Sequence, residues 1–195
     1  MQKDCFLDIS KHKEFLDESI KIYMDSFEEN QREDIKKIQK NINEGTYKMF
    51  SYLQNSEIVG FYILDINHKL NYLICTFLAV KESSRALGIG SKLCINAISY
   101  FRANTNCDWF LIEAEDKQAK LYEKFGFNII DLDYQIPMFN SNKSLKTNLL
   151  VIQKGKKIDN ASLVEIIKDI FHRGYGLSLN DNRLETQLTR LYGHF

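Results

Sequence analysis

Residues 72–101 contain a strand, a glycine turn and a helix in that order, and this segment constrains the fold most strongly. Residues 72–80 are rich in aliphatic, aromatic and β-branched side chains, which predicts a strand buried on both faces. The turn is Arg85-Ala86-Leu87-Gly88-Ile89-Gly90, and apolar residues then recur at helical spacing: Leu93, Cys94, Ala97, Ile98 and Phe101. Glycine allows close approach of a ligand, and the first amides of a helix lack intrahelical acceptors. The turn is therefore predicted to bind an anion such as a pyrophosphate.

Three kinds of phosphate-binding loop have to be compared with this turn. A dinucleotide fingerprint requires glycine or alanine where the chain has Leu93. A nucleotide P-loop requires Gly-Lys-Ser/Thr, whereas the chain has Gly90-Ser91-Lys92. The pattern Arg/Gln-x-x-Gly-x-Gly/Ala matches at Arg85, Gly88 and Gly90. Two glycines near a helix start also fit a simple tight turn, so this match needs a second motif.

The second motif is Tyr-x-x-x-Gly-Phe, formed by Tyr122, Gly126 and Phe127. With both motifs in this order, the chain resembles the GNAT superfamily of acyl-CoA-dependent N-acetyltransferases over roughly residues 5–153. It departs from many relatives at Glu115 and Gln118, where they have asparagine and alanine. The segment before the tyrosine helix is also short, so the resemblance assigns this turn no contact with a pantetheine arm.

Composition limits the classes of protein to which the chain can belong. Its 26 basic and 26 acidic residues give a net charge of zero, which argues against a nucleic-acid partner. The sequence has no apolar run long enough to span a membrane and no signal-peptide core at its start, so we expect a cytoplasmic protein without a membrane partner. Four widely spaced cysteines predict neither a disulfide framework nor a metal site.

The hydrophobic pattern predicts an α/β fold, and the resemblance implies a GNAT-like mixed, mostly antiparallel central sheet flanked by helices. Gly126 is expected to end the tyrosine helix in a left-handed conformation, with Phe127 making an apolar contact. Pro137 is expected in a loop. The expected helices end near Phe27, Gly45 and residue 125, and the expected strands are 4–9, 46–53, 57–66, 72–80, 109–115, 127–134 and 147–154.

Two parts of the chain are expected: a GNAT-like N-acetyltransferase domain over residues 1–154 and a helical extension over residues 155–195. In the extension, Asn160 is a candidate helix cap, and two apolar stripes predict two helices: Leu163, Ile167 and Ile170, then Leu184, Leu188 and Leu191. Packing of this helical pair on the sheet is the ordinary explanation. A homodimer contact or a lid over the acceptor site is the alternative.

The resemblance implies acetyl-CoA (coenzyme A) as cofactor, without a metal. In open α/β sheets ligands bind beyond the carboxyl ends of strands, so the donor is expected near Val80. There the family's diverging strands offer backbone groups to the pantetheine and a main-chain amide to the thioester oxygen; such donors contribute about 3 kcal/mol in acyl transfer. The expected cofactor residues are Phe77, Leu78, Ala79 and Val80 for the pantetheine, and Arg85, Ala86, Leu87, Gly88, Ile89, Gly90, Ser91 and Lys92 for the pyrophosphate.

Tyr122 is the predicted general acid, because a phenol with a pKa of about 10 keeps its proton and can pass it to a thiolate. A purely structural, amphipathic role for Tyr122 is the alternative. Glu113 is the predicted base: it lies at a strand end on the same face as Glu115, and paired carboxylates raise each other's pKa. A solvated position at the rim of the sheet explains Glu113 equally well.

Phe27, Glu28 and Arg32 lie between the first two helices, a region that borders the acceptor cleft in proteins of this kind. Acidic groups there would attract a cationic amine, although a charged turn between helices is the ordinary explanation. The predicted reaction moves an acetyl or short acyl group from coenzyme A to a primary amine of a small molecule or peptide by direct attack. The alternative is a non-catalytic acyl-CoA-binding sensor or assembly module.

Overall fold

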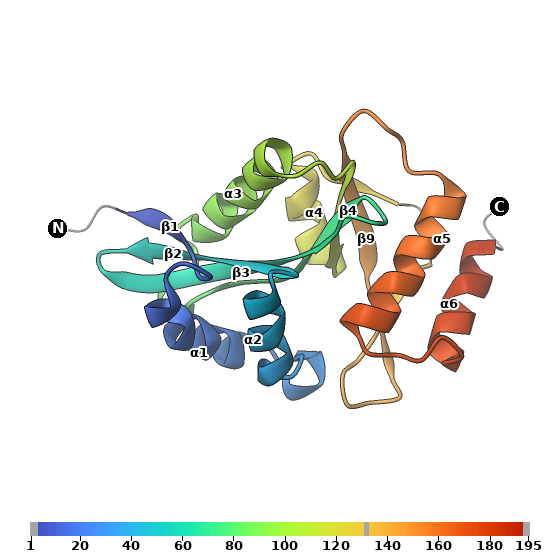
Figure 1. Cartoon of the computed structure of the whole chain (residues 1–195), viewed down its shortest axis with the longest axis horizontal. Helices are drawn as coiled ribbons and strands as arrows, with labels where there is room; N and C mark the ends of the chain where they lie inside the picture. The colour runs from blue at the N-terminus through green and yellow to red at the C-terminus, as the bar shows by residue number, and fades with distance from the viewer. Residues whose placement is uncertain (1–3, 131–132, 193–195) are drawn as a thin grey trace. The chain divides into compact units, whose positions relative to one another are not determined.

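The structure is a computed structural model that describes residues 4–130 and 133–192. The chain divides into two compact units: the first unit comprises Met1–Ile66 and Leu73–Thr105, and the second comprises Asn67–Tyr72 and Asn106–Phe195. Seven strands belong to one mostly antiparallel sheet, and helices flank it (Figure 1). The predicted fold class is therefore confirmed. The division of the chain into residues 1–154 and 155–195 stays a prediction.

The strands of the first unit follow one another in the sheet in chain order. They are β1 (Cys5–Asp8), β2 (Tyr47–Gln54), β3 (Glu57–Asn67) and β4 (Tyr72–Val80). β2 pairs antiparallel with β1 and with β3. Asn55 and Ser56 both have positive φ, 51° and 66°, as a two-residue hairpin turn of type I′ requires.

The helices of the first unit lie on both faces of these strands. In Figure 1, α1 (Leu16–Ser26) and α2 (Ile35–Glu44) lie on one side of β2 and β3, and α3 (Ile89–Asn104) lies on the other. Three short 3₁₀ turns, η1 (Lys13–Phe15), η2 (Glu29–Gln31) and η3 (Glu82–Ser84), connect these elements. The helix predicted to stop near Gly45 does so, because Gly45 adopts the left-handed conformation with φ 80°.

The second unit contains the strands β5 (Trp109–Ala114), β9 (Asn148–Gln153) and β6 (Asn128–Ile129), which pair antiparallel in that order. The strand expected over 127–134 is wrong in extent, since β6 has two residues; residues 131–132 lie outside the described part of the chain. Pro137, expected in a loop, ends β7 (Gln135–Pro137), which pairs with β8 (Ser144–Lys146) in a separate ribbon. Both strands of a two-stranded ribbon are edge strands, where proline is tolerated.

The helices of the second unit are α4 (Asp116–Glu123), α5 (Asn160–Asp169) and α6 (Asn182–Tyr192), with a π-helical turn η4 (Ile170–Gly174) after α5. α5 and α6 lie side by side (Figure 1), so the predicted C-terminal helical extension is present. Its cap differs from the expectation. The Asp159 carboxylate accepts the Ser162 amide at 2.8 Å, and Asn160 is already the first helical residue.

Gly60 in β3 is the point at which α3 packs most closely on the sheet. A Cβ atom on Gly60 would lie 2.9 Å from the Ala79 carbonyl oxygen, 3.0 Å from Leu93 Cδ1 and 3.4 Å from Ile89 Cγ2. Glycine therefore allows the first two turns of α3 to lie against β3 beside the end of β4. No local pattern in the sequence marks Gly60, and this contact was not predicted.

We expect Gly60→Ala to lower the free energy of unfolding by about 1–3 kcal/mol, because the new methyl group would collide with a backbone oxygen that cannot move independently. The matched control is Gly90→Ala in α3, where the Cβ would lie 3.8 Å from Val80 Cγ2, an ordinary contact. This control is expected to keep or slightly raise stability, since alanine is the better helix former. Urea denaturation without added cofactor measures the free energy of unfolding of both variants and of the wild type. A Gly60→Ala protein as stable as the wild type would contradict the packing account.

Candidate active site

The turn between β4 and α3 is exposed over Arg85 to Gly88. Gly88 is the N-cap of α3 and has φ +75°, and Ala86 has φ +64°. In the left-handed region a Cβ costs about 1–2 kcal/mol, so position 88 is unstrained only with glycine. Alanine at position 86 adopts the same region despite its Cβ. The turn thus holds an unusual backbone conformation at the surface.

The first amides of α3 face the turn without helical partners. The first backbone bond that closes the helix runs from the Lys92 amide to the Gly88 carbonyl at 3.1 Å. The amides of Ile89, Gly90 and Ser91 precede that bond, so helix geometry offers them no carbonyl. The first turn of α3 contains no acidic residue, which would compete with an anionic ligand. These residues fit a diphosphate group.

The two basic side chains near this turn are held by other groups in the first unit. Arg85 Nε donates to the Val80 carbonyl at 3.3 Å. The Lys92 ammonium donates to the Tyr52 hydroxyl at 3.0 Å and lies 5.1 Å from the centre of the Tyr52 ring. Main-chain amides are therefore the better placed anion donors, and these side chains would have to turn to reach a ligand.

Phe77 of β4 and Phe27, which follows α1, meet in one aromatic cluster. Their ring centres are 5.3 Å apart, and Tyr23 lies 4.9 Å from Phe77. The structure thus brings together one residue expected to bind the donor and one expected to border the acceptor. Glu28 is exposed, and Arg32 Nη1 donates to the Met24 carbonyl at 3.4 Å and contacts its sulfur at 3.2 Å.

Glu33 anchors the segment that holds Phe27 and Arg32, and the sequence did not single it out. Its side chain is buried, accepts hydrogen bonds from the Tyr47 hydroxyl at 3.0 and 3.2 Å, and pairs with Lys37 at 2.6 Å. The Tyr23 hydroxyl donates to its carbonyl at 3.1 Å. Burial raises the pKa of Glu33, and the Lys37 ammonium partly offsets this effect.

Tyr122 is oriented by the end of α4. The Phe127 amide donates to the Tyr122 carbonyl at 3.3 Å and the Gly126 amide to the Glu123 carbonyl at 3.0 Å, while Gly126 has φ +93°. This is the Schellman pattern, and the usual apolar contact is the one between the Tyr122 and Phe127 rings, 5.9 Å apart. The predicted left-handed glycine is confirmed. The motif Tyr-x-x-x-Gly-Phe therefore fixes the tyrosine by local geometry.

Glu113 of β5 accepts a hydrogen bond on each carboxylate oxygen. The Tyr134 hydroxyl donates to Oε1 and the Tyr175 hydroxyl to Oε2, both at 2.6 Å. Protein surrounds the carboxylate, although part of the side chain remains accessible to solvent. Burial raises the pKa of Glu113, and the two hydrogen bonds partly offset this effect.

The neighbouring carboxylate does not account for the raised pKa of Glu113. Glu115, expected to pair with it on one face of a strand, lies beyond the end of β5, is exposed, and is the N-cap residue of α4. The raised pKa comes from burial instead. Tyr134 and Tyr175, which contact Glu113, were not predicted, because no sequence pattern links positions 21 and 62 residues away.

Glu113 and Tyr122 belong to opposite faces of β5. Phe127, against which Tyr122 packs, contacts Phe110 at a ring distance of 5.1 Å. Phe110 and Glu113 are three residues apart on a strand, so their side chains alternate to opposite faces. A reaction that uses both groups must therefore take place beside an edge or an end of the strand.

Two interior cysteines, Cys75 and Cys94, do not offer a nucleophile. Burial raises the pKa of Cys94 to about 12 and raises that of Cys75 as well, so both remain thiols at neutral pH. Over residues 4–130 and 133–192, the structure contains no cluster of three or more His, Cys, Asp or Glu side chains that could hold a metal ion. No helix in those ranges is long and apolar enough to cross a membrane.

Comparison with known proteins identifies the family. The profile of the acetyltransferase (GNAT) family matches residues 14–127, more than half of the chain, and the chain therefore belongs to this family. A comparison with curated protein sequences found no match.

Solved structures share the fold. A putative GNAT-family acetyltransferase from Bacteroides thetaiotaomicron has a TM-score of 0.73 at 14% identity, with 89% of this chain and 99% of that chain covered. The ribosomal-protein-S18-alanine N-acetyltransferase of Escherichia coli has a TM-score of 0.62 at 17% identity, covering 81% and 98%. Arabidopsis thaliana NAA60 in complex with acetyl-CoA has a TM-score of 0.61 at 18% identity, covering 78% and 100%.

The buried carboxylate of Glu113 predicts a specific dependence of stability on pH. Its pKa is raised in the folded chain above an unfolded value of about 4.3, so its ionisation destabilises the fold. We expect the unfolding free energy of the wild type, minus that of Glu113→Gln, to be highest below about pH 4 and to fall as the pH rises through the folded pKa. Urea denaturation from pH 4 to 8 measures this difference.

The control for this measurement is Glu115→Gln, which removes a carboxylate from an exposed position close by in the sequence. A difference between wild type and Glu113→Gln that is constant, or that rises with pH, would show that burial does not raise the pKa of Glu113.

Proposed function

We propose that this chain transfers an acetyl group from acetyl-CoA to a primary amine by direct attack of the amine on the thioester. The observation that carries this proposal is the exposed, left-handed turn at Gly88, which leaves the first amides of α3 open to an anion in a member of the acetyltransferase (GNAT) family. Similarity to NAA60, whose structure contains acetyl-CoA, supports the choice of cofactor.

In the proposed complex, the amides of residues 88–91 bind the diphosphate of coenzyme A. Backbone groups of residues 77–80 at the end of β4 contact the pantetheine, and a main-chain amide there binds the thioester oxygen. That donor stabilises the negative charge that develops on the oxygen during attack. The other expected cofactor residues, Arg85, Ala86, Leu87 and Lys92, belong to the same turn and first helical turns.

The proposed reaction uses one base and one acid. Glu113 accepts a proton from the ammonium form of the acceptor, and the neutral nitrogen attacks the carbonyl carbon of the thioester. The new carbon–nitrogen bond forms as the carbon–sulfur bond breaks, and Tyr122 donates its proton to the departing thiolate. The nitrogen then loses its second proton, the Tyr122 hydroxyl is restored by taking up one proton, and Glu113 releases its proton to solvent. A carboxylate whose pKa is raised by burial suits the base, because its affinity for the proton comes closer to that of the amine. The products are an acetylated amine and coenzyme A.

The acceptor is proposed to approach over Phe27, Glu28 and Arg32, beside the aromatic cluster with Phe77. The exposed carboxylate of Glu28 would attract a cationic amine before it loses its proton. The similar E. coli structure is named for acetylation of an alanine of a ribosomal protein. Peptides with N-terminal alanine therefore belong in the acceptor screen beside polyamines and small amines.

The test is release of free thiol from acetyl-CoA in such a screen, with the wild type and Tyr122→Phe compared on the best acceptor. We expect Tyr122→Phe to lower kcat by about 10²–10⁴-fold, because the proton donor to the thiolate is lost. Its affinity for coenzyme A, measured by calorimetry, should change less than twofold, since phenylalanine preserves the ring contact with Phe127.

Two other outcomes of this experiment would count against the proposed function. Full activity of Tyr122→Phe would exclude its role as the acid. Coenzyme A binding without turnover on any amine would contradict the proposed reaction and favour a non-catalytic acyl-CoA-binding sensor or assembly module.

A further inference from the structure

Tyr175 lies outside residues 14–127, the part of the chain that matches the family, yet its hydroxyl bonds to Glu113. It donates to Oε2 at 2.6 Å while Tyr134 donates to Oε1 at the same distance. One donor on each oxygen fixes the plane of the carboxylate group, because rotation about its terminal bond would break both hydrogen bonds. Tyr134 is fully buried and Tyr175 is half-buried.

A π-helical turn places Tyr175. In η4 the Tyr175 amide donates to the Ile170 carbonyl at 3.2 Å, five residues back, where an α-helix would bond four residues back. The Tyr175 ring then packs between Phe171, with ring centres 5.9 Å apart, and Phe139 at 5.2 Å. Ring contacts on two sides leave the hydroxyl little freedom beside Glu113.

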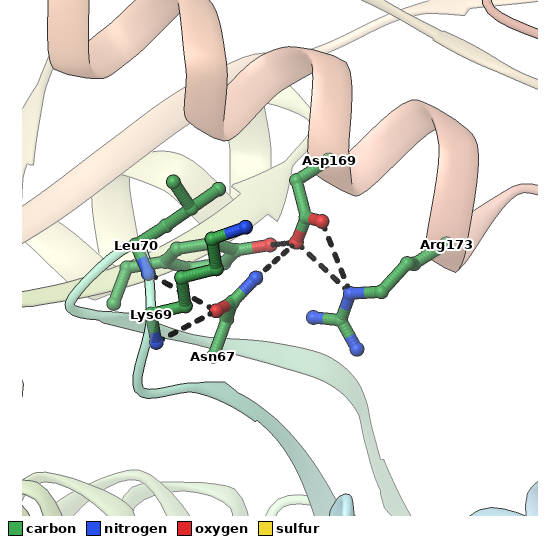
Figure 2. Close-up of polar contacts among 6 residues, drawn as sticks. Asn67, Lys69, Leu70, Asp169 and Arg173 are labelled. Carbon is green, nitrogen blue, oxygen red and sulfur yellow. Dashed lines mark hydrogen bonds and ion pairs between the residues drawn. The ribbon is translucent and has the colours of Figure 1, made fainter.

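Asp169, the residue immediately before this π turn, is bound by three side chains (Figure 2). Its carboxylate accepts hydrogen bonds from the Tyr72 hydroxyl at 2.6 Å, from Asn67 Nδ2 at 2.7 Å, and from Arg173 Nε at 3.0 and 3.2 Å. The Asn67 side chain is itself fixed, since its Oδ1 accepts the amides of Lys69 and Leu70 at 3.0 and 3.1 Å. The start of η4 is thus attached to residues 67–72 of the same unit.

α6 supports the other donor, Tyr134. Gln187 is 1% exposed, and its amide group brackets that residue: Oε1 accepts the Gln135 amide at 2.9 Å, and Nε2 donates to the Asp133 carbonyl at 3.2 Å. The Thr147 amide donates to the Tyr134 carbonyl at 3.1 Å. Both tyrosines that bind Glu113 therefore depend on residues of the C-terminal helices.

We propose that the C-terminal extension completes the base of the reaction, with Tyr175 as a positioning residue that orients the Glu113 carboxylate. This inference rests on the proposed function, in which Glu113 is the base. A hydroxyl that donates to a carboxylate favours its ionised form, so Tyr175 limits the rise in the pKa of Glu113 that burial causes. The titratable groups described around Glu113 are Tyr134 and Tyr175, and Tyr72 acts on Tyr134.

The first test follows the Glu113 carboxyl group directly and needs no acceptor. Protein labelled with carboxyl-¹³C glutamate is titrated by NMR, and Glu113→Gln identifies the Glu113 signal by its disappearance. Tyr175→Phe keeps the ring contacts and removes one donor to the carboxylate, so the pKa of Glu113 should rise by about one unit. Tyr134→Phe should raise it in the same direction. Tyr100→Phe, which removes a hydroxyl from the first unit, should leave it unchanged.

The second test is the pH profile of kcat/KM for acetyl-CoA and the amine found in the screen. In Tyr175→Phe the acidic limb should move to higher pH by the same amount as the NMR titration, while the KM for acetyl-CoA stays unchanged. A merely structural role would lower activity at every pH without moving this limb.

The outcomes separate the inference from the proposed function. If Glu113→Gln is inactive but Tyr175→Phe changes neither the titration nor the limb, the positioning role of Tyr175 is overturned. If Glu113→Gln keeps the wild-type rate and profile, the base assignment fails, and the inference fails with it.

Discussion

The close packing of α3 against Gly60 of β3 is the contact on which the proposed donor site depends. It sets the position of Ile89 and Leu93, and through them the position of the first amides of α3 beside Ala79 at the end of β4. The left-handed Gly88 then leads the chain into the helix without covering those amides. A core contact therefore determines where the exposed anion donors lie.

The catalytic groups proposed in the second unit depend on two different kinds of constraint. Tyr122 is held by a local one, the Schellman pattern at Gly126 and Phe127, which lies entirely within six consecutive residues. Glu113 is held by a long-range one, since its two donors come from the segment before β7 and from the end of η4. Burial makes the carboxylate a stronger proton acceptor, and the two tyrosines limit that effect.

This difference explains what the sequence could predict. Local patterns sufficed for the left-handed Gly126 and the strand–turn–helix around Gly88, because each is specified by a few consecutive residues. The contact of Gly60 with α3 and the contacts of Glu113 arise only when distant segments pack together. A single sequence carries no signal for such pairs.

The predictions from the sequence that the structure corrects also failed for physical reasons. The strand expected over 127–134 failed because apolar residues alone do not show where pairing stops and a second ribbon begins. Glu115 was expected beside Glu113 from strand alternation, but β5 ends at Ala114, so the alternation does not extend that far. The helix cap was predicted at Asn160 but is Asp159, one residue earlier, which is a normal uncertainty at a helix end.

We propose above all that the main-chain amides ahead of α3 bind the diphosphate of coenzyme A. The most direct measurement is an amide NMR titration of the folded protein with coenzyme A, compared with pantetheine, which lacks the diphosphate. We expect coenzyme A to cause the largest downfield shifts at the amides of residues 88–91, and we expect pantetheine to cause no such shifts there. This binding would be contradicted if coenzyme A shifted only the amide signals of other residues. It would also be contradicted if coenzyme A shifted no amide signal of the folded protein.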